Sequence, residues 1–143
     1  MEIYQTEMRL KPRQRGFHLI TDEILNHCSE IEDFKFGFLQ IFIKHTSAGL
    51  TINENADSTV REDFRSHFDK MVPENQEYYK HTTEGSDDMP AHIKSSLTGP
   101  SLQIPITNGS LNMGTWQGIY LCEHRNSGGS RKLVLTIYGE EDI

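Results

Sequence analysis

The most apolar stretch of the chain is the ten-residue segment Phe34-Lys35-Phe36-Gly37-Phe38-Leu39-Gln40-Ile41-Phe42-Ile43. It is too short for a membrane-spanning helix, which needs about 20 predominantly apolar residues. Aromatic and β-branched residues dominate it, and both kinds favour strands. A near-continuous apolar run is typical of a strand that is buried on both faces. The segment therefore predicts a central β-strand around which the rest of the fold is built.

Periodicity on either side of this strand predicts the remaining elements. Strands are expected at residues 3–10, 16–20, 101–106, 114–123 and 131–139. Apolar residues at helical spacing predict one helix from Thr21 and a second from about Ala56 to Met71.

Residues 73–100 are polar and rich in proline, with little periodicity, so we expect a long functional loop there. Strands that follow one another late in the chain favour antiparallel pairing. The predicted fold class is therefore α+β, a mostly antiparallel β-sandwich with two helices, in a single domain that spans residues 1–143.

Composition excludes several classes of protein. The chain carries 14 Lys and Arg against 21 Asp and Glu, a formal net charge of −7. This charge argues against a general binder of nucleic acid or of anionic membranes, because both need local positive charge. The first residues, Met1 to Tyr4, form no apolar signal region, and Cys28 and Cys122 form neither a disulfide framework nor a CxxC motif. We expect a cytoplasmic protein.

Seven histidines are many for a chain of 143 residues. His81 and His92 flank a run that includes Asp88, but their spacing matches no standard metal motif. A third ligand would come from elsewhere, and His45, at the end of the apolar strand, is the natural candidate. Three histidines with an open position would resemble a catalytic zinc site. The alternative is that His81 and His92 only hydrogen-bond the loop backbone.

Other polar residues could hold an anion or a substrate. Thr46 and Ser47, beside His45, could present hydroxyls and backbone amides to an anion. Arg131, near a Gly-Gly hairpin, suits a phosphate, although it could equally be a surface arginine. Trp116 fits the core or a subunit contact, and Gln117 could reach a ligand from the opposite face of its strand.

Three further histidines lie in predicted helices or strands that lack clustered acids. They are interpreted as structural; they are His18, His27 and His67.

Several motifs in order along the chain resemble those of the YjbQ-like family, whose members are often labelled secondary thiamine-phosphate synthase enzymes. The matching segments are residues 45–57, His81, residues 88–97, residues 114–117 and Gly139-Glu140. The resemblance implies a compact α+β sandwich that assembles as a homotrimer with sites near subunit boundaries. It also implies that His45, His81 and His92 hold a divalent metal, zinc or magnesium, or act on a phosphorylated ligand. His124 stands where members vary and is a candidate fourth ligand.

Three hypotheses for function follow. The first is an enzyme of phosphate-ester or diphosphate chemistry, with weak thiamine-phosphate synthase activity, in which His45 or Asp88 moves a proton. Thr46, Ser47, Trp116, Gln117 and Arg131 would then bind the substrate. The scarcity of candidate cations argues against this hypothesis. The second is a homotrimer that binds a metal and a small anion without turnover. The third, a structural subunit, leaves the polar segment 81–92 unexplained.

Overall fold

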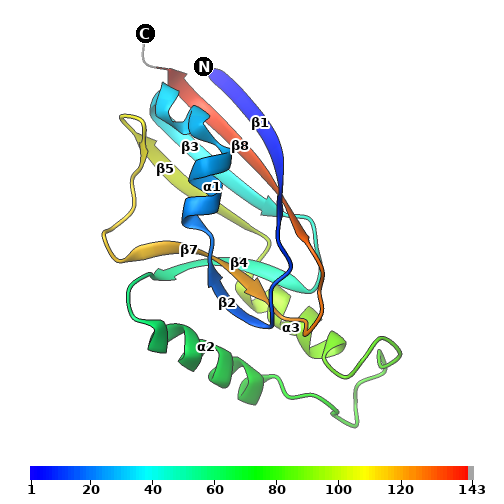
Figure 1. Ribbon diagram of the computed structural model, residues 1–143. Coiled ribbons are helices and arrows are strands. Elements are labelled where there is room, and N and C mark those ends of the chain that lie inside the picture. Colours follow the sequence, from blue (N-terminus) through cyan, green and yellow to red (C-terminus); the bar gives the residue numbers. More distant parts are fainter. Residues whose placement is uncertain (142–143) are drawn as a thin grey trace.

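The computed structural model describes residues 1–141, which form eight strands, three α-helices and a short 3₁₀ helix (Figure 1). Five strands form one antiparallel sheet in the order β1 (Glu2–Leu10), β8 (Arg131–Glu141), β3 (Phe34–Ile43), β5 (Ser101–Thr107) and β6 (Ser110–Leu111). A second antiparallel sheet has the order β2 (Gly16–Leu19), β7 (Gln117–Glu123) and β4 (Ala48–Glu54). The helices are α1 (Thr21–His27), the 3₁₀ helix η1 (Ser29–Asp33), α2 (Ser58–Met71) and α3 (Asp88–Thr98). The predicted α+β class is confirmed.

The two sheets and α1 share one buried apolar core. Its members include Leu39 and Ile41 of β3, Leu133 and Leu135 of β8, Leu50 of β4, Ile119 and Leu121 of β7, and Ile24 of α1. Burial of such side chains is the dominant favourable contribution to folding. The α2 helix packs against β2, where its Phe64 and Phe68 rings contact Phe17. None of the helices in residues 1–141 has both the length and the apolar character needed to cross a bilayer.

The β3 strand is central in the larger sheet, as predicted, but it is not buried on both faces. Leu39, Ile41 and Ile43 are buried, whereas Phe36 and Phe42 are 54% and 46% exposed. The expectation of two-sided burial is therefore wrong for this chain. Only one face of β3 meets the core between the sheets, and nothing in residues 1–141 covers the aromatic residues on the other face.

Four elements were not predicted: the short elements η1 and β6, and the longer β4 and α3. Residues 48–54 form β4, which pairs with β7 along its whole length. The predicted loop contains α3, which begins at Asp88 and includes Pro90 within its first turn. A proline is tolerated there because the first N–H groups of a helix have no partner within it. In the sequence, Pro90 favours a loop, because a proline inside a helix usually interrupts it.

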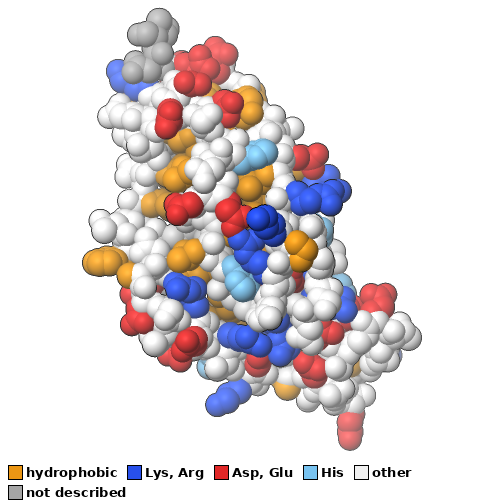
Figure 2. Space-filling model, in the orientation of Figure 1, with side chains coloured by type: hydrophobic (Ala, Val, Ile, Leu, Met, Phe, Trp, Pro, Cys, Tyr) orange, Lys and Arg blue, Asp and Glu red, His pale blue; other side chains and the backbone are white. Residues whose placement is uncertain are grey.

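The α3 helix is fixed to its surroundings from two sides. Lys94, only 2% exposed, donates to Asp69 of α2 at 2.7 Å. On the other side, α3 packs on β4, where the end of the helix approaches Gly49 so closely that an added Cβ would lie 3.0 Å from the carbonyl oxygen of Gly99. The middle and the end of α3 are therefore held in a defined position. Acidic and basic side chains are interspersed over the face shown in Figure 2.

Candidate metal centre

Polar side chains of the segment that the sequence predicts as a loop, residues 73–100, meet at Asp88, the first residue of α3. Asp88 is 2% exposed. One of its oxygens, Oδ1, accepts a hydrogen bond from Arg125 Nη1 at 2.7 Å. The other, Oδ2, faces His81 Nε2 at 2.7 Å and His92 Nε2 at 3.1 Å. A single buried carboxylate oxygen thus meets two imidazole rings.

The helix and the chain after β3 together orient His92. It follows Asp88 by four residues, so the two side chains share one face of α3. His92 Nδ1 lies 2.9 Å from the carbonyl oxygen of Thr46. Because a carbonyl only accepts, His92 Nδ1 donates to Thr46, and this bond turns Nε2 of the same ring toward Asp88. Histidines that bind metals characteristically donate their other ring N–H in this way.

His81 completes the cluster from the segment before α3. Its side chain is 44% exposed and that of His92 is 31% exposed. The two rings lie with centroids 5.3 Å apart. The cluster is therefore buried at the carboxylate and open to solvent at the histidines, so that an ion held there would keep room for a ligand.

A network of charged groups fixes the carboxylate. Arg125 Nε donates to Asp87 Oδ2 at 2.9 Å, and Arg125 Nη2 donates to the carbonyl oxygen of Glu84 at 2.9 Å. Burial raises the pKa of Asp88, but the hydrogen bond from His81 and the charges of His92 and Arg125 lower it by more, so that the net shift is downward. Asp88 is therefore ionised near neutral pH, which is the state that binds a cation.

The donor set fits a divalent metal. One ligand atom each from His81, Asp88 and His92 lies within 4.8 Å of the other two. With bonds of about 2.0–2.2 Å, two ligands of a tetrahedral ion lie about 3.3–3.6 Å apart, so the ligand atoms, now 2.7 and 3.1 Å apart, would separate by less than about 1 Å to admit an ion. Two histidines and one carboxylate suit zinc and other first-row ions with open positions.

His45 lies outside this cluster. Its Nε2 accepts the backbone N–H of Lys132 at 2.8 Å. Burial, followed by the charge of Arg131, lowers the pKa of His45, so the ring is neutral and its proton is on Nδ1. Of the three predicted ligands, the structure brings together His81 and His92, and the third member of the group is Asp88.

Arg131 does not occupy the surface position that a phosphate-binding residue needs. It is 4% exposed, and its guanidinium makes two hydrogen bonds to Glu123, which is itself buried. It also donates to the carbonyl oxygen of Ser47 at 3.2 Å. This arginine therefore joins β8 to β7 and to the chain before β4, and its guanidinium is engaged by Glu123 and not by a surface anion.

The two residues predicted to hold an anion after β3 instead contribute carbonyl groups. Thr46 accepts from His92, and Ser47, which is buried, accepts from Arg131. They position other side chains through their backbone.

Trp116 and Gln117 lie at the opposite end of β7 from Glu123. Trp116 is 66% exposed, so it does not belong to the core of this chain. Gln117 lines a hollow of about 460 Å³ and accepts the N–H of Gly114. Because β7 has seven residues, its two ends lie roughly 20 Å apart. These two residues are therefore not part of the cluster around Asp88.

His124 is packed in a structural environment. It is 2% exposed, lies against the rings of Phe17 and Phe68, and shares a hydrogen bond with Thr98 at 3.2 Å. Burial, with the nearby charges of Lys94 and Arg131, lowers the pKa of His124 to about 3. Its position gives it no contact with the Asp88 cluster.

The histidines predicted to be structural also make hydrogen bonds within the fold. His18 bonds the backbone of Gln14, and His27 bonds the side chain of Thr6.

Arg125 was missed at the level of sequence, and Asp88 was predicted as a residue that moves a proton, without a place among the three metal ligands. The four-residue spacing of Asp88 and His92 is a signal that a helix prediction would have revealed. Arg125 has no comparable signal, because its partners Asp87 and Asp88 lie 38 and 37 residues away along the chain.

Comparison with known proteins identifies the family. The model of a protein family described as "UPF0047 protein YjbQ-like" matches residues 6–140. This chain belongs to the YjbQ-like family. The UPF0047 protein YjbQ of Escherichia coli O157:H7 is 50% identical over 137 residues, which cover 96% of this chain and 99% of that relative. The protein of the same name from Salmonella typhimurium is 53% identical over the same length and coverage.

Solved structures of other YjbQ-like proteins share the fold. An uncharacterized member from Clostridium acetobutylicum is 39% identical, with a TM-score of 0.82, and the match covers 93% of this chain and 99% of that one. A YbjQ-like protein of unknown function from Sulfolobus solfataricus has a TM-score of 0.85 at 24% identity, with 97% and 99% coverage, and shows the fold alone.

The buried ion pair of this YjbQ-like protein gives a testable prediction. Arg131→Met should lower the free energy of unfolding by about 3–5 kcal/mol in urea denaturation, because it leaves the charge of Glu123 buried and unpaired. The matched variant Arg13→Met breaks a more exposed pair with Glu23 and should cost less than about 1 kcal/mol. Equal losses in the two variants would contradict the structural role of Arg131.

Proposed function

We propose that this YjbQ-like protein is a metal-dependent enzyme that acts on a phosphorylated small molecule, with the ion held by His81, Asp88 and His92. The observation that carries the proposal is the single buried oxygen of Asp88 facing two Nε2 atoms. A bound divalent ion would neutralise the negative charge that develops on a departing phosphate or diphosphate. The thiamine-phosphate synthase activity implied by the family resemblance is one reaction of this class.

The chain's own residues prepare the site. Arg125 fixes the carboxylate of Asp88, and the carbonyl oxygen of Thr46 fixes the ring of His92. Preorganised ligands bind more tightly because less side-chain freedom is lost on binding. His45, which immediately precedes Thr46, carries its proton on Nδ1, and this N–H is the proposed hydrogen-bond donor to an oxygen of the departing group.

We also propose that three copies assemble, as the family resemblance implies. The outer face of β3 presents Phe36, Phe38 and Phe42, which are 54%, 39% and 46% exposed. Contiguous exposed aromatic side chains mark surfaces that bind other proteins. A monomeric mass in size-exclusion chromatography with light scattering would contradict this assembly.

The metal site is tested by titration. Protein stripped with a chelator should bind Zn²⁺ in isothermal titration calorimetry, and His81→Ala should weaken that binding by at least about tenfold. His81 is suitable because its exposed ring can be removed with little effect on the core. The control is His67→Ala, which removes another exposed histidine, in α2, and should bind as tightly as the unaltered protein.

Turnover is measured with the same proteins on a panel of phosphorylated metabolites that includes the two halves of thiamine phosphate. The proposal expects product only when metal is present, and loss of product in His81→Ala. Metal-independent turnover would contradict it. Metal binding with no product from any compound would favour the alternative, a protein that binds a metal and an anion without catalysis.

A further inference from the structure

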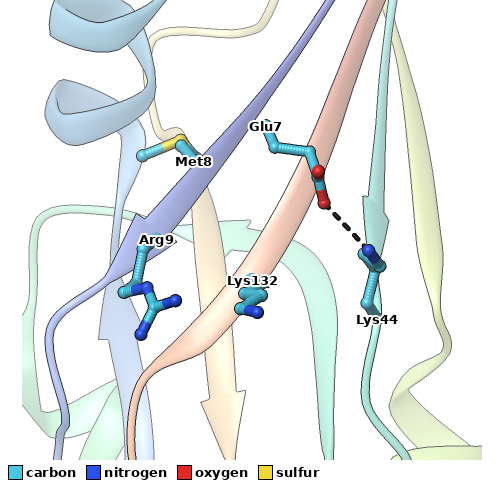
Figure 3. Close-up of a pocket in the computed structure, with 5 residues that line it drawn as sticks. All are labelled: Glu7, Met8, Arg9, Lys44 and Lys132. Atoms are coloured by element: carbon cyan, nitrogen blue, oxygen red, sulfur yellow. Dashed lines mark hydrogen bonds and ion pairs between the residues drawn. The ribbon is translucent and has the colours of Figure 1, made fainter.

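A row of positively charged side chains crosses the larger sheet at the end of β3. Arg9 of β1 stands directly opposite Lys132 of β8 in the antiparallel register. On the other side of β8, the backbone N–H of Lys44 donates to the carbonyl oxygen of Lys132. Figure 3 shows Arg9, Lys132 and Lys44 side by side across the three strands. Directly opposed residues project from the same face of a sheet.

This row surrounds a hollow on the surface. Its lining residues are Glu7, Met8, Arg9, Lys44 and Lys132, and its volume is about 260 Å³. Pockets for drug-sized ligands are about 300–1,000 Å³. The hollow therefore suits a phosphate or diphosphate group better than a large organic ligand.

The charge of the hollow is unusual for this chain. Glu7 is its one acid and pairs with Lys44 at 2.9 Å. Hydrogen bonding to Lys44 and the charges of Lys44 and Lys132 lower the pKa of Glu7, which stays ionised. Arg9 and Lys132 make no ion pair within residues 1–141. Two positive charges are thus left over in the pocket of a protein whose net charge is −7.

Five buried or half-buried cations of the fold have acidic partners, whereas Arg9 and Lys132, which are exposed, form no ion pair within residues 1–141. These partnered residues are Arg13, Arg15, Lys94, Arg125 and Arg131. Like charges placed directly opposite each other destabilise a sheet. Arg9 and Lys132 repel each other in this arrangement, and an anion bound between them would remove that repulsion.

We propose that the hollow between β1, β8 and β3 is a second binding site, which takes the phosphate or diphosphate group of a small molecule through Arg9, Lys132 and Lys44. The guanidinium of Arg9 can bind two phosphate oxygens at once, and the two ammonium groups act as point charges. The site contains none of the proposed metal ligands and goes beyond the proposed function.

The new site and the proposed metal site lie close along the chain. Only His45 separates Lys44 from Thr46, whose carbonyl oxygen orients His92, and His45 itself accepts the N–H of Lys132. The segment from Lys44 to Thr46 therefore connects the two sites. An experiment on the new site must remove metal, so that the two proposals can fail separately.

Pyrophosphate is the probe, titrated calorimetrically into protein kept in a chelator at low ionic strength. The variants Arg9→Gln and Lys132→Gln should each raise the Kd by at least about tenfold, with thermal stability equal to or above that of the unaltered protein, because each removes a repulsion. The control Lys70→Gln, an exposed lysine of α2, and the metal-site variant His81→Ala should bind pyrophosphate normally.

Unchanged affinity in both pocket variants would overturn the proposal, as would loss of pyrophosphate binding in His81→Ala. A phosphate group could also belong to a lipid. Sedimentation with vesicles that contain phosphatidic acid distinguishes this source. Binding to the vesicles in the absence of pyrophosphate binding would overturn the assignment to a small molecule.

Discussion

A carboxylate that is almost completely removed from water at the start of a helix must be compensated, since burying an unpaired charge costs several kcal/mol. Asp88 meets this requirement by drawing three separate parts of the chain together: the segment that carries His81, the first turns of α3 with His92, and the hairpin after β7 with Arg125. Arg125 satisfies one oxygen, and the other is left to two imidazole rings. The polar end of the molecule is arranged around the carboxylate of Asp88. Its Oδ2 atom, which Arg125 does not contact, is the atom proposed to bind a metal.

A second buried charge pair supports the first. Glu123 and Arg131 join the ends of β7 and β8, and Glu123 Oε2 also accepts the backbone N–H of Arg125 at 3.1 Å. The residue that fixes Asp88 is therefore itself fixed by the end of a central strand. Sites supported on rigid elements in this way hold their geometry more accurately than sites on free loops. Arg131 serves the site by anchoring it, without contact with the proposed ligand.

Local patterns predicted the α+β class, most of the strands and α2, because the periodicity of apolar residues reflects the face that each element buries. They failed where the deciding partner is distant. The aromatic run of β3 indicated two-sided burial, although only one face meets the core. Arg131 and Arg125 stand in similar sequence surroundings, but one is paired with Glu123 and the other with Asp88, and only the folded chain determines which. His81 and His92 were recognised as a pair, whereas His45 was grouped with them because the direction of a side chain after a strand cannot be derived from spacing.

The most direct test of the central claim is the position of a bound ion. Crystals of the unaltered protein grown with Zn²⁺ should give an anomalous difference peak about 2.0–2.2 Å from His81 Nε2, His92 Nε2 and one oxygen of Asp88, with Arg125 still bonded to the other oxygen. A peak that appears instead at His45 or His124, or no peak beside Asp88 at saturating zinc, would contradict the assignment of this carboxylate as the centre of the site.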